Sequence, residues 1–123
     1  MQAYGNYNLD IKIDYPTNSE IVIVFCHGSG ANIYDNHREI AGKHFNYFDL
    51  FVDEFCRRNI AFCRWNTRGR SISDVPSDFV SINIEEYATY YPSTSIQDIV
   101  TVKNYIKALP QFKKSKILLM GII

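Results

Sequence analysis

Three short runs of apolar residues limit what this chain of 123 residues can fold into. They lie at positions 21–26, 60–63 and 117–120, and none shows the polar alternation of a half-exposed strand. A short apolar run bounded by polar or turn residues is typical of a strand that is buried on both faces. Such strands occur in parallel sheets covered by helices. The runs therefore predict an α/β protein with three layers and a mostly parallel sheet.

The segments between these runs have helical periodicity. Apolar side chains, among them Phe48 and Phe55, recur on one face of residues 45–58, which predicts an amphipathic helix. Asn59 predicts the end of this helix, because asparagine tolerates the left-handed conformation found at helix termini. The same periodicity predicts a second helix over residues 95–109.

Local signals set the remaining boundaries. Thr94 and Gln97 have the spacing of a capping box at the start of the second helix, and Pro110 stops that helix. Residues 9–15 alternate between apolar and charged side chains, which predicts a strand with one solvated face. We therefore expect one domain over residues 1–123, with strands near 9–15, 20–26, 60–66 and 116–121 and helices near 45–58 and 95–109.

Charge and composition exclude several functional classes. The 13 basic and 13 acidic residues give no net charge, so the sequence lacks the electrostatic footprint of a nucleic-acid-binding protein. It shows neither a signal peptide nor an apolar run long enough to span a bilayer, and we expect a cytoplasmic protein. Cys26, Cys56 and Cys63 match neither a disulfide framework nor a zinc pattern, which indicates reduced, mostly buried thiols. We expect no metal and no cofactor.

Two loops follow the first two buried strands, where ligands bind in open parallel sheets. Residues 26–32 read CHGSGAN, and Gly28 and Gly30 allow the backbone N–H groups around Ser29 to turn toward a bound group. This is neither a dinucleotide fingerprint nor a phosphate loop. It is therefore either a set of donors for a developing oxyanion or a plain turn. Residues 66–73, NTRGRSIS, taken alone read as a solvated polar turn.

Taken together, these segments resemble the α/β-hydrolase superfamily in its bacterial esterase-like or lipase-like branches. IVIVFCHGSG looks like that family's third strand and its HG-x oxyanion loop, and RWNTRGRSISD looks like its fourth strand and D-x-R-G-x-G-x-S loop. SIQDIVTVKNYIKALP resembles the helix before the nucleophile strand, and KILLMG resembles that strand with the first glycine of the G-x-S-x-G elbow. The resemblance implies that the strand near 20–26 lies between those near 60–66 and 116–121, with the first strand at one edge.

The resemblance also implies roles in the first loop. The backbone N–H of Ser29 would be one oxyanion donor, and His27, Gly28 and Gly30 would shape the loop around it. The implied activity is hydrolysis of a small carboxylic ester by a serine nucleophile.

In the second loop, Arg68 and Gly69 match the family's pattern. Asn66 stands where the family usually has aspartate, and Ser71 stands where it usually has glycine. The resemblance gives this loop a structural role more than a catalytic one.

The elbow is where the sequence departs most from the family. Ile123 stands at the position of the nucleophilic serine, and the acid and histidine that follow this serine in chain order are missing. We interpret residues 1–123 as the N-terminal half of a serine hydrolase, truncated and inactive alone. Two alternatives stay open: a complete non-catalytic α/β binding module, or half of a split hydrolase that a second chain complements. Residues 117–120 would form an apolar sheet edge, so we expect self-association or a complementing C-terminal half there.

Local patterns do not favour another catalytic site or a metal site. His37 and His44 read as surface or helix-entry residues, and the histidines lack the i, i+4 pair of helical zinc sites. Cys26 and His27 are neighbours on a strand, so their side chains point to opposite faces and cannot form a catalytic dyad.

Overall fold

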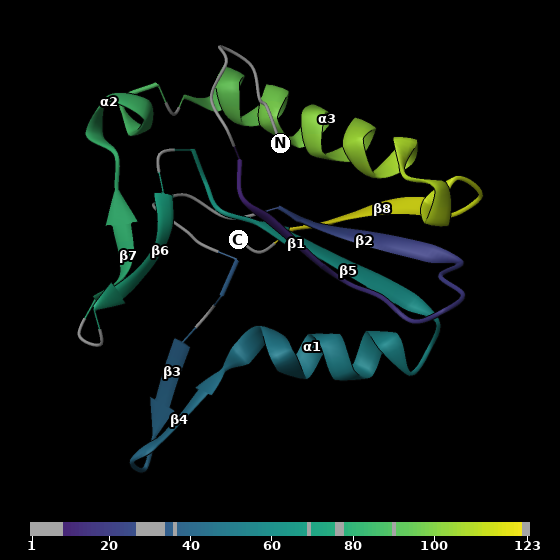
Figure 1. Cartoon of the computed structure of the whole chain (residues 1–123), viewed down its shortest axis with the longest axis horizontal. Coiled ribbons are helices and arrows are strands. Elements are labelled where there is room, and N and C mark those ends of the chain that lie inside the picture. The colour runs from purple at the N-terminus through teal and green to yellow at the C-terminus, as the bar shows by residue number, and fades with distance from the viewer. Residues whose placement is uncertain are drawn as a thin grey trace.

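A computed structural model describes residues 9–26, 34–35, 37–68, 70–75, 78–89 and 91–121. Its main sheet has four strands in the order β1-β5-β2-β8 (Figure 1). β2 runs parallel to both of its neighbours, β5 and β8, whereas β1 runs antiparallel to β5. The strands span β1 Ile11–Asp14, β2 Ile21–Cys26, β5 Ile60–Trp65 and β8 Lys116–Gly121.

The three apolar runs form the three parallel strands, as predicted. β2 and β5 are largely buried, but the prediction of a buried strand is wrong for β8, where Leu118 and Leu119 are about half exposed because β8 lies at the edge of the described sheet. The strand order also agrees with the expectation, because β2 lies between β5 and β8, and β1 lies at one edge. The sheet is mixed and not wholly parallel, since β1 adds an antiparallel edge strand.

Helices α1 (Tyr47–Cys56) and α3 (Pro92–Ala108) cover opposite faces of this sheet (Figure 1). Val22 and Val24 of β2 pack with the buried residues of α3. Ile23 and Phe25 of β2 pack with Phe48 of α1 instead. Successive side chains of a strand point to opposite faces, so a strand between two helices needs apolar residues at every position. Each fully buried side chain of this size stabilises the fold by roughly 1.5–3 kcal/mol.

Helix α1 begins two residues later than predicted, because residues 43–46 belong to a strand. The side chain of Asn46 caps the helix and accepts a hydrogen bond from the backbone N–H of Phe48 over 3.2 Å. Asn59 has a φ of 59° in the turn that follows the helix. Asn59 has the predicted left-handed conformation, but the helix already ends at Cys56, with Arg57 as its C-cap.

Helix α3 begins at Pro92, earlier than predicted. Thr94 lies inside its first turn, where its Oγ1 accepts a hydrogen bond from the backbone N–H of Tyr91 over 2.8 Å. The predicted capping box with Thr94 as the cap and Gln97 as its partner is therefore wrong. The helix ends at Ala108, as predicted from Pro110, and a short 3₁₀ helix, η1 (Pro110–Phe112), follows.

Two β-hairpins and a short helix were not predicted. β3 (His37–Ile40) pairs with β4 (Lys43–Asn46) through a turn in which Ala41 and Gly42 both have positive φ. β6 (Arg70–Val75) pairs with β7 (Asp78–Ile82), and α2 (Ile84–Tyr87) follows. His37 and His44 are therefore strand residues of the first hairpin, and the exposed side chain of His44 agrees with its prediction as a surface residue. Both hairpins project from the end of the sheet where β2 and β5 finish (Figure 1).

Candidate functional site

The carboxyl ends of the parallel strands lie side by side, which is where sequence reasoning placed the site. Cys26 at the end of β2 pairs with Gly121 at the end of β8, and the same register brings Trp65 of β5 to this edge. The oxyanion-loop candidates His27, Gly28, Ser29 and Gly30 lie outside the described residues, as do Gly69 and Ile123. Their roles stay predictions. The described part of the site consists of the residues that flank these segments, among them residues 34–35 and 66–68.

Asn66 ties the loops around this edge together. Its side chain is buried, and its Oδ1 accepts a hydrogen bond of 2.7 Å from the backbone N–H of Tyr34, shortly after the glycine loop. Its own backbone N–H donates to the carbonyl of Asp10 over 2.9 Å, and its Nδ2 lies 3.4 Å from Asp10 Oδ2. Asn66 thereby holds Tyr34, which follows the glycine loop in the sequence, close to the start of β1 and the end of β5.

Arg68 is buried and forms a two-pronged ion pair with Asp98 of α3. Its Nη2 lies 2.6 Å from Asp98 Oδ1, and its Nε lies 3.2 Å from Asp98 Oδ2. Its Nη1 also donates to Thr89 Oγ1 over 3.2 Å. A planar guanidinium that meets a carboxylate through two parallel bonds fixes both position and orientation. The pair locks the loop after β5 onto the helix that leads into β8.

Asp98 was not singled out from the sequence, although a signal was present. It shares the buried face of α3 with Val102 and Ile106, at a spacing of four residues. A carboxylate on an apolar helix face needs a buried partner, because an unpaired buried charge is strongly unfavourable. The spacing could have indicated that a partner exists, but not that Arg68 is that partner.

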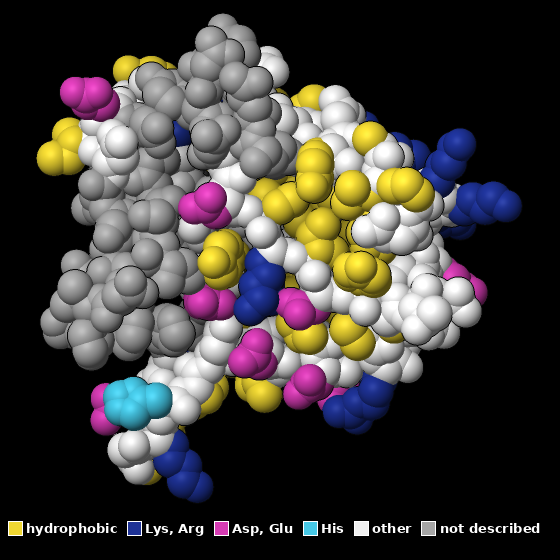
Figure 2. All heavy atoms as spheres, viewed as in Figure 1, with side chains coloured by type: hydrophobic (Ala, Val, Ile, Leu, Met, Phe, Trp, Pro, Cys, Tyr) yellow, Lys and Arg dark blue, Asp and Glu magenta, His cyan; other side chains and the backbone are white. Residues whose placement is uncertain are grey.

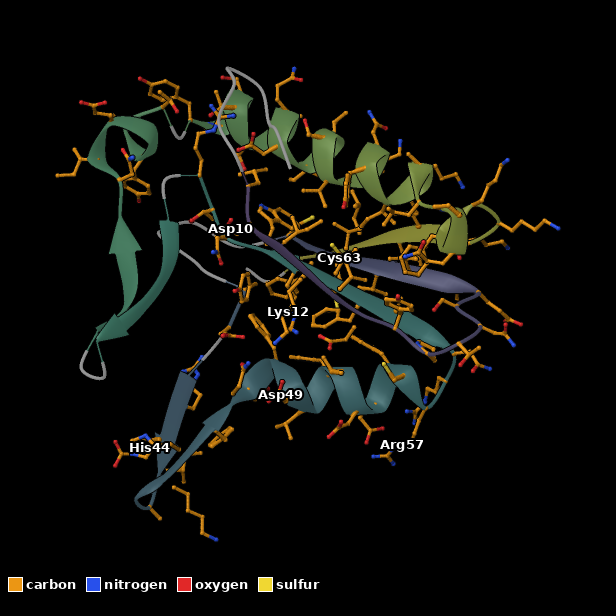
Figure 3. The ribbon with its side chains drawn as sticks, viewed as in Figure 1. Asp10, Lys12, His44, Asp49, Arg57 and Cys63 are labelled. Carbon is orange, nitrogen blue, oxygen red and sulfur yellow. The ribbon has the colours of Figure 1, made fainter. Side chains whose placement is uncertain are left out.

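A second polar cluster lies between β1 and the start of α1. Lys12 Nζ lies 3.9 Å from Asp35 Oδ1 and 5.9 Å from the centre of the Tyr34 ring. The same Asp35 oxygen accepts a hydrogen bond of 2.8 Å from Asn46 Nδ2, so the residue that caps α1 also holds the cluster in place. Figure 3 shows Lys12 between the sheet and α1, with Asp49 on the helix, and Figure 2 shows acidic side chains gathered on this face.

The phenol of Tyr34 has a higher pKa in this position than a tyrosine in water. Burial raises its pKa, and the carboxylates of Asp35 and Asp10 raise it further. Tyr34 therefore stays protonated at neutral pH, and its hydroxyl can donate a hydrogen bond but cannot act as a base.

Arg64 of β5 lies directly opposite Lys12 of β1 in the antiparallel pair. Its side chain is fully buried against the rings of Phe48 and Phe62, and its Nη2 pairs with Asp14. Its Nε and Nη1 make no hydrogen bond. The buried charge of Arg64 is thus compensated by the carboxylate of Asp14. We interpret Arg64 as a structural residue.

The three cysteines form no disulfide with one another, and only Cys63 is buried, whereas Cys26 and Cys56 are partly exposed. The prediction of mostly buried thiols therefore holds for Cys63 alone. Burial raises the pKa of Cys63 to about 12, and burial also raises the pKa of Cys26. The thiolate is the nucleophilic form, so neither residue is an activated nucleophile at neutral pH.

The described residues can position a loop, but they assemble no catalytic pair. His44 is exposed in the first hairpin, where its Nε2 lies 4.0 Å from Glu39 Oε2. In the part of the chain that the structure describes, no three His, Cys, Asp or Glu side chains gather as a metal site would need. No helix within the described ranges is both long and apolar enough to cross a membrane.

Compared with protein-family models, with curated proteins and with solved structures, the chain has no match.

Proposed function

We propose that this chain is the N-terminal half of an α/β-hydrolase-like protein whose parent activity is hydrolysis of carboxylic esters by a serine nucleophile. In this proposal the loop after β2 supplies one oxyanion donor, the backbone N–H of Ser29. Because Ile123 stands at the position of the nucleophile, we expect the 123-residue chain alone to be inactive.

The strand order is the observation that carries the proposal. β2 lies between β5 and β8, and α1 and α3 connect these strands on opposite faces of the sheet. Ligands of open parallel sheets bind beyond the carboxyl ends of the strands, where successive crossovers diverge to opposite faces. The glycine loop directly follows the last residue of β2 in the sequence, which supports an oxyanion loop at this edge of the sheet.

The contacts of Asn66 and Arg68 give further support. Donors for an oxyanion are effective only when the protein holds them fixed before the reaction. Asn66 anchors the chain just after the glycine loop, and Arg68 anchors the neighbouring loop to α3. The resemblance gives both positions a structural role, and both side chains are engaged in structural bonds.

The genomic sequence that follows codon 123 provides a direct test. We expect one of the reading frames that overlap codon 123 to encode a serine at or directly after this position, followed by glycines and then by an acid and a histidine. The joined protein should hydrolyse p-nitrophenyl acetate, and replacement of that serine by alanine should abolish the activity. Native protein whose measured mass corresponds to a chain ending at Ile123, with no such frame downstream, would contradict the proposal.

An assay of the 123-residue chain completes the test. We expect no ester hydrolysis above the rate in buffer. Activity that Ser29→Ala abolishes would count against the proposal, because Ser29 is given a role only through its backbone N–H, which alanine retains.

A non-catalytic binding module is the second candidate. It is favoured by the lack of a catalytic pair among the described residues, where Asn66 and Arg68 only hold loops in place. This candidate requires the 123-residue chain to be a monomer with one cooperative thermal transition. A broad transition or none would exclude it.

A further inference from the structure

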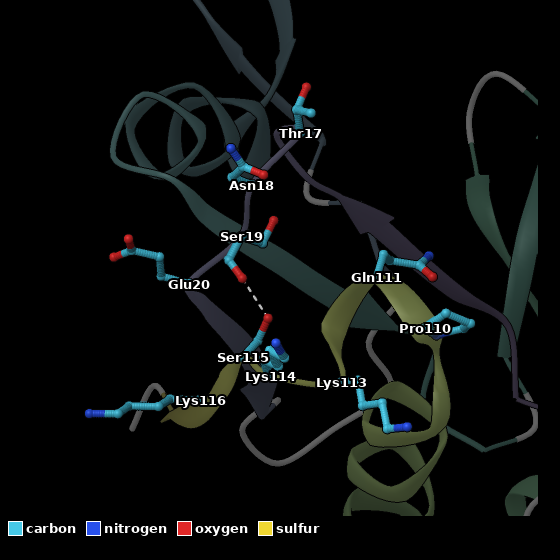
Figure 4. Close-up of a pocket in the computed structure, with 10 residues that line it drawn as sticks. All are labelled: Thr17, Asn18, Ser19, Glu20, Pro110, Gln111, Lys113, Lys114, Ser115 and Lys116. Carbon is cyan, nitrogen blue, oxygen red and sulfur yellow. Dashed lines mark hydrogen bonds between the residues drawn. The ribbon is translucent and has the colours of Figure 1, made fainter.

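A hollow of about 560 Å³ opens at the amino ends of the parallel strands, which we call the amino-end hollow (Figure 4). It lies between the turn that joins β1 to β2 and the segment that joins α3 to β8. Ile21 and Lys116, the first residues of β2 and β8, pair beside it. It is therefore at the opposite end of the sheet from the glycine loop, and the proposed function does not use it.

Hydrogen bonds between the two lining segments fix the floor of the hollow. Ser115 Oγ donates to the carbonyl of Ser19 (Figure 4), and the backbone N–H of Lys116 donates to the carbonyl of Glu20 over 3.0 Å. The N–H of Glu20 donates in turn to the carbonyl of Asn59 over 3.1 Å. These bonds hold the two lining segments at a fixed separation.

The charge around the hollow is unbalanced. Lys113, Lys114 and Lys116 line it, and Glu20 is its one carboxylate among the lining residues. None of the three lysines has an ion-pair partner among the described residues. Lys107 does not line the hollow, but its Nζ donates to the carbonyl of the lining residue Ser115 over 3.2 Å. Lys107 is in the last turn of α3 and complements the helix dipole there, but the other three lysines lie beyond the helix.

The positions of the lysines indicate the kind of ligand. Figure 4 shows Lys113 and Lys116 on opposite sides of Ser115, with Glu20 on the side of Lys116. An ammonium group acts as a compact point charge with three N–H donors, and each of the two lysines attracts an anionic group on its own side. A ligand that contacts both sides therefore needs at least two anionic groups. A hollow of this size falls within the range of small-molecule sites.

We propose that the amino-end hollow binds a small organic or inorganic polyanion whose phosphate or carboxylate groups bridge Lys113 and Lys116. The side chains of Thr17, Asn18 and Gln111, which also line the hollow, supply neutral hydrogen-bond donors to the ligand's oxygens. The carboxylate of Glu20 repels the anion and therefore lowers the affinity of the hollow for it.

Calorimetric titration of the full chain with citrate and with tripolyphosphate at low ionic strength tests the proposal. We expect saturable binding of one anion per chain. Tighter binding of tripolyphosphate would assign the site to phosphates, and tighter binding of citrate would assign it to carboxylates. Inorganic phosphate should bind more weakly than either probe, because it cannot reach both lysines.

Charge-changing variants separate a site from general attraction. Lys113→Gln and Lys116→Gln should each weaken binding about two- to five-fold, and Glu20→Gln should tighten it by a similar factor. Lys43→Gln, in the distant first hairpin, changes the net charge equally and should leave the affinity unchanged. The proposal would be wrong if no saturable binding occurs, if Lys43→Gln weakens binding as much as Lys113→Gln, or if Glu20→Gln fails to tighten it. The tightening expected of Glu20→Gln cannot come from a loss of folding.

Discussion

At the scale of single residues, the ion pair of Arg68 and Asp98 is the contact whose loss should cost most. Both side chains are almost fully buried. Removing one partner leaves the other charge buried and uncompensated, which typically costs about 3–5 kcal/mol. We expect Asp98→Asn to lower the free energy of unfolding by about this amount in urea, followed through the fluorescence of Trp65, the one tryptophan of the chain.

Two comparisons make that prediction specific. Arg58→Gln removes an exposed ion pair with Glu54 and should change stability little, because solvent screens such pairs. The double variant Arg68→Met, Asp98→Leu removes both buried charges and should be more stable than Asp98→Asn alone. A double variant less stable than Asp98→Asn would show that the cost lies in packing and not in the unpaired charge.

The partners of the buried arginines could not be predicted from the sequence. Arg68 was placed correctly in the loop after the second buried strand, and the resemblance gave it a structural role. Its partner Asp98 is 30 residues away, and the partner of Arg64, Asp14, is 50 residues away. Local spacing indicates which face of an element a residue occupies, but a pair across the sheet depends on how the elements pack.

At the scale of elements, strands were predictable where burial dictates the sequence and unpredictable where it does not. The apolar runs of β2 and β5 follow from their position between two helices. The run of β8 is equally apolar, although Leu118 and Leu119 are about half exposed. The first hairpin has the sequences HREI and KHFN, which are mostly polar and carry no period of two. Its turn is formed by Ala41 and Gly42 at positive φ, and alanine is not a residue that predicts such a turn.

The start of α1 combines a helix cap with the polar cluster of β1, and the two roles can be separated. Asn46 Oδ1 accepts from the N–H of Phe48, whereas its Nδ2 donates to Asp35. We expect Asn46→Ala to lower the free energy of unfolding by about 1 kcal/mol or more, because it removes both bonds. Asn46→Ser retains a capping oxygen and loses only the bond to Asp35, so it should be less destabilising. Equal urea midpoints for the two variants would show that the cap contributes nothing.

At the scale of the whole molecule, β8 leaves an apolar edge on the sheet. Within the described ranges, β8 pairs with β2 on one side and with no strand on the other. Leu118 and Leu119 are 50% and 58% exposed, and as successive strand residues they point to opposite faces. Exposed edge strands carry unpaired N–H and C=O groups and template pairing with another chain, and natural proteins usually protect them with charge.

We expect this edge to cause self-association that increases with concentration, with β8 of one copy pairing against β8 of another. An antiparallel pairing would bring only apolar side chains together between Ile117 and Met120, so no charge opposes it. Leu118→Lys and Leu119→Lys should each shift the molecule toward the monomer in light scattering, because a lysine on the edge is costly to bury. Leu50→Lys, at an equally exposed leucine on α1, should leave the association unchanged. A monomer at every concentration, or a Leu50→Lys variant as effective as Leu118→Lys, would show that the β8 edge is not the surface that associates.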